Sequence, residues 1–461
     1  MKACFVKRDY KAAEHAAYVA TFDANKRYDA LRVLGYATLA LGELERAERA
    51  YRALADEYGL QPGDLLAPAR DDLAKSKLRG AEPLRALLAP AKVDRAEATA
   101  FWKSLDDDLR AVLRANLDDA PAKGALTGKW LDAVFMQQAI AIDQPVKKLA
   151  PLARMPRLVS LRIDGELPML PFRDIGKLTN LQRLHIDSDC DLRDIDFVAT
   201  LRQLDTLIVF ETDRITDLAC LADLDELTFL QTGDTQVRDI DFLRGKSKLE
   251  NLTLTVAKSV TDFRALQDLT ALEAIELRAT GIKTLAPLVK ATKLERVQIH
   301  GSDFHGTCDL RTLAGLENKP ALFWVEVERA PKLTDISALA TATGLKRVLL
   351  NETPKIADFS PLANHTAIEH LELYGAHSLT DLAVLGAKPD VRSLELTYSA
   401  VADLTPLAKW KSLETLSYYH TKAKQKLHGI GKLMALDLTV DPDDFVPADA
   451  KKLSRMRPSR E

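Results

Sequence analysis

Cysteine is scarce in this chain of 461 residues. The four copies, Cys4, Cys190, Cys220 and Cys308, lie far apart and include no Cys-x-x-Cys pair. A small protein stapled by disulfides needs cysteines at a much higher density, so the sequence excludes a disulfide framework. This usage is typical of a reducing compartment, and we expect a cytoplasmic location.

The chain also lacks long hydrophobic runs and an excess of charge of one sign. No stretch approaches 18 apolar residues without a charge, so we expect no transmembrane helix. Charged residues such as Lys7, Arg8 and Asp9 interrupt the start of the chain, so we expect no secretory signal.

The charges are nearly balanced. Lysine and arginine total 64 against 67 aspartate and glutamate, a formal net charge of -3. A protein that binds nucleic acid without sequence preference would be basic. We therefore expect neither a nucleic acid nor a membrane as a partner.

Familiar catalytic motifs are missing as well. The sequence has no phosphate-binding GxxxxGK[ST] loop, no GxGxxG, no HExxH, no GxSxG and no EF-hand loop. We therefore predict that the protein is not an enzyme and has no catalytic residues and no cofactor. One polar segment, 300–309, holds His300, Asp303, His305 and Cys308. These are competent metal ligands, but their spacing fits no established site. We favour a long loop without a metal, and a metal-binding protein using this loop is the alternative.

A repeated phrase dominates what is present. The pattern apolar-x-x-apolar-x-apolar recurs thirteen times, at steps of 20 to 28 residues, through about two thirds of the chain. Its copies begin at Leu158, Leu181, Leu204, Leu224, Leu249, Leu272, Leu294, Leu322, Leu345, Ile368, Val391, Leu413 and Leu433. Alternation with period two predicts a short strand in every copy. One repeat cannot bury its own apolar face, so the copies must stack and form a parallel sheet.

A second phrase follows most of these strands. It reads Ile215-Thr-Asp-Leu218 in one copy and Leu333-Thr-Asp-Ile336 in another. An aspartate here can accept hydrogen bonds from the backbone N–H groups of a following helical turn. We therefore predict that these aspartates cap short helical turns on the convex side and have no catalytic role.

The whole phrase, as in 272–285, resembles the leucine-rich repeat family, and within it the short internalin-like class. The resemblance covers about residues 150–440. It implies an α/β solenoid, a horseshoe with a parallel sheet on its concave side, and it implies that the concave face binds proteins.

The N-terminal third is rich in alanine, leucine and arginine and has helical periodicity. The segment that runs from Tyr28 through Gly35 and Gly42 to Tyr51 resembles a tetratricopeptide repeat. We expect a tetratricopeptide-like helical region at 1–91, a helical cap at 92–150, the solenoid at 151–440 and a tail at 441–461. Within the cap, amphipathic helices are predicted at 94–117 and 130–142.

The concave face is where a partner is expected. We predict a non-enzymatic scaffold, a bacterial protein and a monomer, that binds an unknown protein or peptide. An adaptor or regulatory subunit that recruits an enzyme through the helical region is the alternative. The predicted contact residues share the outward positions of the strands and are apolar, aromatic or charged. They are Ile208, Phe210, Leu230, Arg278, His300, Trp324, Glu326, Glu328, Arg347, His370, Glu372, Tyr374, Glu395 and Tyr419.

Overall fold

The computed structural model describes residues 93–418 and the strand at 437–440. Within the first range it leaves out 118–125, 127, 166, 168–169, 188–191, 211–213, 234, 236, 257–258, 279–280 and 302–305. The tetratricopeptide-like region expected at 1–91 and the tail expected at 441–461 lie outside the described residues. The chain divides into two compact units, 1–191 and 192–461, and each is described by itself.

In the first unit the described residues begin with three helices, α8 (Arg95–Ser104), α9 (Asp107–Ala115) and α10 (Lys129–Phe135). The single helix predicted at 94–117 is wrong, because Asp106 caps a new helix and accepts a hydrogen bond from the backbone N–H of Leu109. The apolar residues of the two helices nevertheless share a buried side, as an amphipathic pattern predicts. Phe101, Trp102, Leu105, Leu109, Val112 and Leu113 are all buried.

Three parallel strands follow in the same unit: β1 (Ala139–Ile142), β2 (Ser160–Asp164) and β3 (Arg183–Asp187). A short 3-10 helix, η1 (Ala150–Arg154), and the turn α11 (Phe172–Ile175) connect them. The helix predicted at 130–142 is therefore wrong in its second half. Ile140 and Ile142 are buried and alternate with alanines, so this segment pairs as a strand with Leu161 and Ile163.

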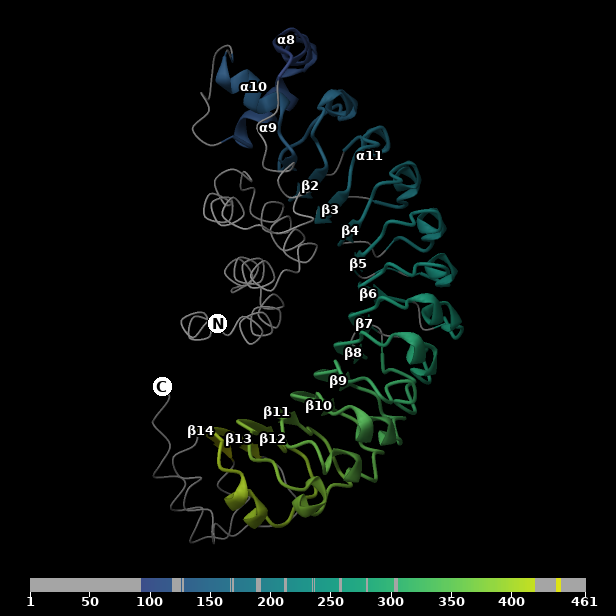
Figure 1. Ribbon diagram of the computed structural model, residues 1–461, viewed down its shortest axis with the longest axis vertical. Helices are drawn as coiled ribbons and strands as arrows, with labels where there is room; N and C mark the ends of the chain where they lie inside the picture. Colours follow the sequence, from purple (N-terminus) through teal and green to yellow (C-terminus); the bar gives the residue numbers. More distant parts are fainter. Residues whose placement is uncertain are drawn as a thin grey trace, which may run out of the picture. The chain divides into compact units, whose positions relative to one another are not determined.

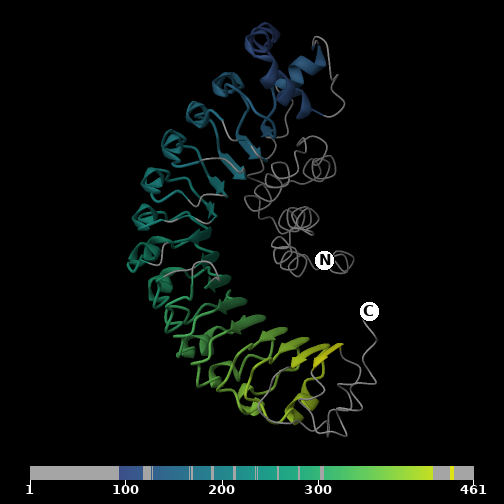
Figure 2. The ribbon, with the colours of Figure 1, turned by 180° about the vertical axis from the view of Figure 1, so that it is seen from behind.

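The second unit is a stack of repeats in which each strand is followed by a turn or a 3-10 helix. Neighbouring strands pair in parallel and in chain order. The strands are β4 (Thr206–Val209), β5 (Phe229–Thr232), β6 (Asn251–Thr255), β7 (Ala274–Arg278), β8 (Arg296–His300), β9 (Trp324–Glu328), β10 (Arg347–Asn351), β11 (His370–Glu372), β12 (Ser393–Glu395), β13 (Thr415–Tyr418) and β14 (Asp437–Val440). Within this unit the strands line the inner, concave side and the helical turns lie outside (Figures 1 and 2).

The 3-10 helices of the second unit are η2 (Asp196–Thr200), η3 (Ala219–Leu221), η4 (Asp241–Leu243), η5 (Arg264–Asp268), η6 (Ala286–Lys290), η7 (Ser337–Thr341), η8 (Ser360–Leu362), η9 (Leu382–Leu385) and η10 (Thr405–Lys409). Most of the 3-10 helices begin two residues after a repeated aspartate; η9 begins directly after Asp381, and η6 follows Thr284 instead of an aspartate. The capping prediction is confirmed, because each predicted aspartate accepts a hydrogen bond from the backbone N–H two residues later. These are Asp217, Asp239, Asp262, Asp335, Asp358, Asp381 and Asp403.

The pairing register corrects two copies of the repeat. Leu207 pairs with Leu230 and Val209 with Thr232, so the fourth copy begins at Leu227 and not at Leu224. The leucines at 224, 227 and 230 match the first two positions of the template in two registers, and only the pairing with the neighbouring strand selects one. In the last copy Leu416 pairs with Leu438, so Leu438 occupies the middle position of the repeat and not its last.

Buried lysines occupy a place in the repeat that other copies fill with leucine. Lys246, Lys319 and Lys388 stand where Leu224 and Leu269 stand in their own copies. The ammonium groups of all three donate hydrogen bonds to backbone carbonyls of the preceding repeat. Buried charges need such partners, so these lysines bind successive repeats together. The sequence analysis did not find them.

Candidate functional site: the concave face of β7 to β12

Three rows of side chains run across the concave face, because parallel pairing places equivalent positions side by side. The first row contains Arg296, Trp324, Arg347 and His370. The middle row contains Glu276, Gln298, Glu326, Leu349, Glu372 and Glu395. The third row contains Arg278, His300, Glu328 and Asn351. The repeat spacing in the sequence predicts one shared position for Glu326, Glu372 and Glu395; the register confirms it, and Glu276 joins them.

An aromatic and cationic stack lies in the first row. The guanidinium of Arg347 is 4.4 Å from the centre of the Trp324 ring, and that of Arg296 is 5.6 Å from it on the neighbouring strand. Such contacts attract a cation to the face of an indole ring. Trp324 is only 7% exposed and Arg296 is buried with it, so the half-buried Arg347 is the part of this stack that lines the concave face.

Hydrogen bonds fix the carboxylates of the middle row. The Oε2 atom of Glu326 accepts from the indole N–H of Trp324 at 3.0 Å and from the side-chain amide of Gln298 at 2.8 Å. Glu372 accepts from the Asn351 amide at 3.0 Å, and Glu395 from the backbone N–H of Thr397. Burial is the main reason why the pKa of Glu326 lies above its usual value.

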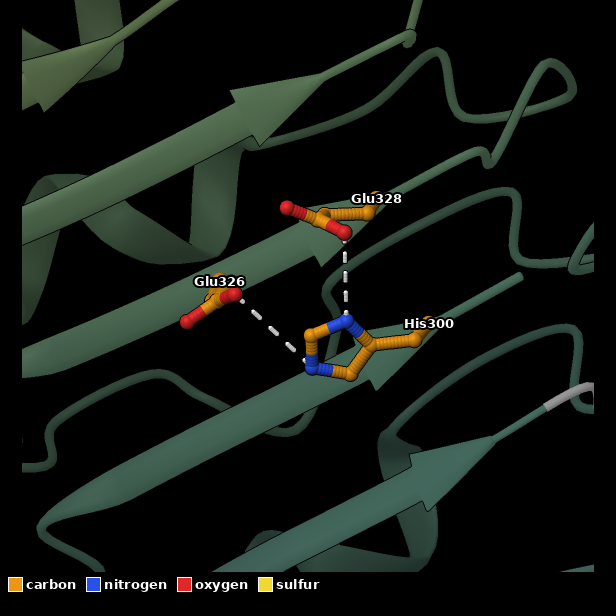
Figure 3. A group of neighbouring side chains, drawn as sticks. All are labelled: His300, Glu326 and Glu328. Carbon is orange, nitrogen blue, oxygen red and sulfur yellow. Dashed lines mark hydrogen bonds and ion pairs between the residues drawn. The ribbon is translucent and has the colours of Figure 1, made fainter. Parts of the chain in front are cut away.

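His300 faces two of these carboxylates from the next strand (Figure 3). Its Nδ1 atom lies 3.4 Å from Oε2 of Glu328, and its Nε2 atom lies 3.9 Å from Oε1 of Glu326. Burial works to lower the pKa of His300, but the surrounding glutamates outweigh it and raise this pKa above its usual value. The hydrogen bond with His300 holds the pKa of Glu328 below its usual value.

An aromatic pair lies beyond the acidic row. The rings of Tyr374 and Tyr398 meet edge to face with their centres 5.4 Å apart. Tyr398 is 40% exposed, and the sequence analysis missed it because it lies in a turn after β12 and outside the strand pattern. Its backbone carbonyl lies 2.8 Å from Nδ1 of His377.

The predicted contact residues divide into four groups. Leu230 is a correction: it is 1% exposed and belongs to the core, because the register of β5 turns it inward. Trp324 and Glu326 lie on the concave side but are nearly covered. Tyr419 lies outside the described residues. The others are half-buried or exposed: Ile208, Phe210, Arg278, His300, Glu328, Arg347, His370, Glu372, Tyr374 and Glu395.

The described residues of the segment 300–309 do not bring metal-binding side chains together. Cys308 is fully buried, and Asp309 forms an ion pair of 2.6 Å with Lys332. Residues 302–305, with Asp303 and His305, lie outside the described part of the chain. Among described residues, the two glutamates that group with His300 lie on β9 and not in its own loop.

The described residues include no helix that is long and apolar enough to cross a membrane.

Solved structures share this architecture. A leucine-rich repeat protein of Leptospira interrogans matches 81% of this chain and 99% of its own, at 17% identity and a TM-score of 0.57. An internalin from Listeria monocytogenes matches 73% of this chain and 95% of its own, at 19% identity and a TM-score of 0.52. No family model and no curated protein sequence matches. These likenesses establish that the chain has the leucine-rich repeat fold.

Proposed function

We propose that this protein is a non-enzymatic binding module, and that the concave face of β7 to β12 holds a basic segment of a partner protein. The observation that carries the proposal is the middle row. It places Glu276, Glu372 and Glu395 at one register of the sheet, with Glu326 among them. A lysine- or arginine-rich segment crossing the strands would meet these carboxylates in turn.

The carboxylates of the middle row are already held in fixed positions, and this supports binding. Hydrogen bonds from Asn351 and Thr397 already hold the carboxylates of Glu372 and Glu395 in place. A partner would therefore order few side chains when it binds, and this lowers the entropic cost of association. The half-buried Tyr374 and the exposed Tyr398 stand at the end of the row, and tyrosine is a residue type that often contributes strongly to interfaces.

Arrayed peptides test the proposal. One set is rich in lysine and arginine, and a matched set carries glutamate at the same places. The wild-type chain should prefer the basic set, and this preference should weaken as salt rises. The double change Glu372→Gln and Glu395→Gln should weaken basic-peptide binding by about tenfold, as expected when partly desolvated charge pairs are lost.

Glu226 provides a control. Its carboxylate forms an ion pair with Lys248, and it lies just before β5 and outside the concave row. The change Glu226→Gln should therefore leave binding unchanged. Equal binding of both peptide sets, or an equal loss in the Glu226 variant, would show that the row is not the contact surface.

A further inference from the structure

We infer that His300, Glu326 and Glu328 form a site for a divalent transition-metal ion of the zinc class. The site shares Glu326 with the row proposed above but needs no bound peptide, and it differs from the loop site considered from the sequence. Its ligands come from two adjacent strands, β8 and β9.

The backbone places the three side chains together. His300 pairs directly with Glu328 in the register of β8 and β9, and Glu326 lies two residues earlier on the same face of β9. One donor atom from each residue can be chosen so that all three lie within 4.8 Å of one another. Zinc binds nitrogen and oxygen at about 2.0–2.2 Å, so tetrahedral donors lie about 3.4 Å apart. Small side-chain rotations would close the remaining gap.

Glu326 and His300 each direct one donor atom to the centre that has no hydrogen bond to another residue. Trp324 and Gln298 both donate to Oε2 of Glu326, which leaves the Oε1 atom directed at the imidazole. The Nε2 atom of His300 is buried and has no hydrogen-bond partner. A buried polar atom without a partner is costly, and an ion between the ring and the carboxylate would satisfy it.

The hydrogen bonds around the three side chains resemble those that orient metal ligands in other proteins. Outer hydrogen bonds orient ligating carboxylates and tune the site, and Glu326 has two such bonds. The nearby Arg278 is occupied by an ion pair of 2.7 Å with Glu276. Two carboxylates and one neutral imidazole provide a charge of -2, which a divalent ion balances. This nitrogen and oxygen set suits zinc and similar ions better than calcium.

Titration of the full chain with zinc chloride and with manganese chloride, by calorimetry and by equilibrium dialysis, tests the inference. The wild-type chain should bind zinc at a saturable site that His300→Ala and Glu328→Gln each weaken by at least about 100-fold, because even outer-shell losses cost 10–100-fold. Gln298→Ala, which removes only an outer hydrogen bond, should weaken zinc binding by about tenfold. His370→Ala is the matched histidine control on the same face and should keep the site.

Circular dichroism of each variant shows whether the fold is intact, and Glu328→Gln preserves the side-chain shape if His300→Ala fails to fold. Zinc binding that is absent in the wild type, or that is unchanged in both ligand variants, overturns the inference. Neither result bears on peptide binding, because these titrations contain no peptide.

Discussion

The indole N–H of Trp324 donates a hydrogen bond of 3.0 Å to Glu326, two residues further along the same strand. Arg296 and Arg347 cover the two sides of the same ring. The tryptophan therefore organises the concave face from beneath. A partner would meet the half-buried Arg347 and not the ring itself, because Arg296 and Glu326 are buried together with Trp324.

Replacing Trp324 with alanine should destabilise the fold. The change removes a nearly buried indole and leaves Glu326 with one hydrogen bond fewer, so the free energy of unfolding should fall by about 3–5 kcal/mol. Urea denaturation followed by circular dichroism measures this. Tyr374→Ala, a half-buried aromatic on the same face, should cost clearly less, and equal losses would contradict this view of Trp324.

Leu230 and Ile208 test the corrected register of β5. Leu230 is 1% exposed, whereas Ile208 on the neighbouring strand β4 is half-buried on the concave side. Leu230→Ala should reduce the free energy of unfolding by about 2–5 kcal/mol, and Ile208→Ala should reduce it less. The opposite order, measured in the same denaturation experiment, would support the placement predicted from sequence.

The capping aspartates predict acid sensitivity. Hydrogen bonds from Ser337, and one of 2.8 Å from the Thr312 hydroxyl, hold the pKa of Asp335 below its usual value of 3.8. The unfolded chain then binds the proton more readily, so the stabilisation is complete above about pH 3.8 and is lost as pH falls through the folded pKa. Asp335→Asn should flatten the decline of the urea midpoint below pH 4. An unchanged slope would contradict the assignment.

Lys388 predicts a rise of stability with pH in the alkaline range as well. Burial lowers its pKa from 10.5 to about 8, although its ammonium donates to the carbonyls of Leu362, Ala363 and Leu385. Between these values the unfolded chain binds more protons, so Lys388 makes the free energy of unfolding rise with pH, by up to about 1.4 kcal/mol per unit. Other groups titrate here too, so the measurement is the difference between wild type and Lys388→Met. A difference that is constant from pH 8 to 10.5 would exclude the shift.

Much of the repeat architecture could be predicted because it is local. Spacing of leucines specifies which side chains face the core, and an aspartate caps a turn two residues away, as at Asp335. The errors arose where local signals were degenerate. Leu224, Leu227 and Leu230 fit the template in two registers, and the segment 130–142 contains both a helical and a strand pattern.

The sequence by itself determined the repeating strands, the capping aspartates and the shared row of glutamates. These follow from a period that every copy repeats, so no long-range contact was needed to find them. The accessibility of the concave residues, and the contacts among them, depend on how the repeats stack. Trp324 is covered by arginines that lie 23 and 28 residues away, and His300 meets glutamates 26 and 28 residues further along the chain. Stacking of adjacent repeats creates these contacts, and the same stacking sets the burial and the pKa direction of each group.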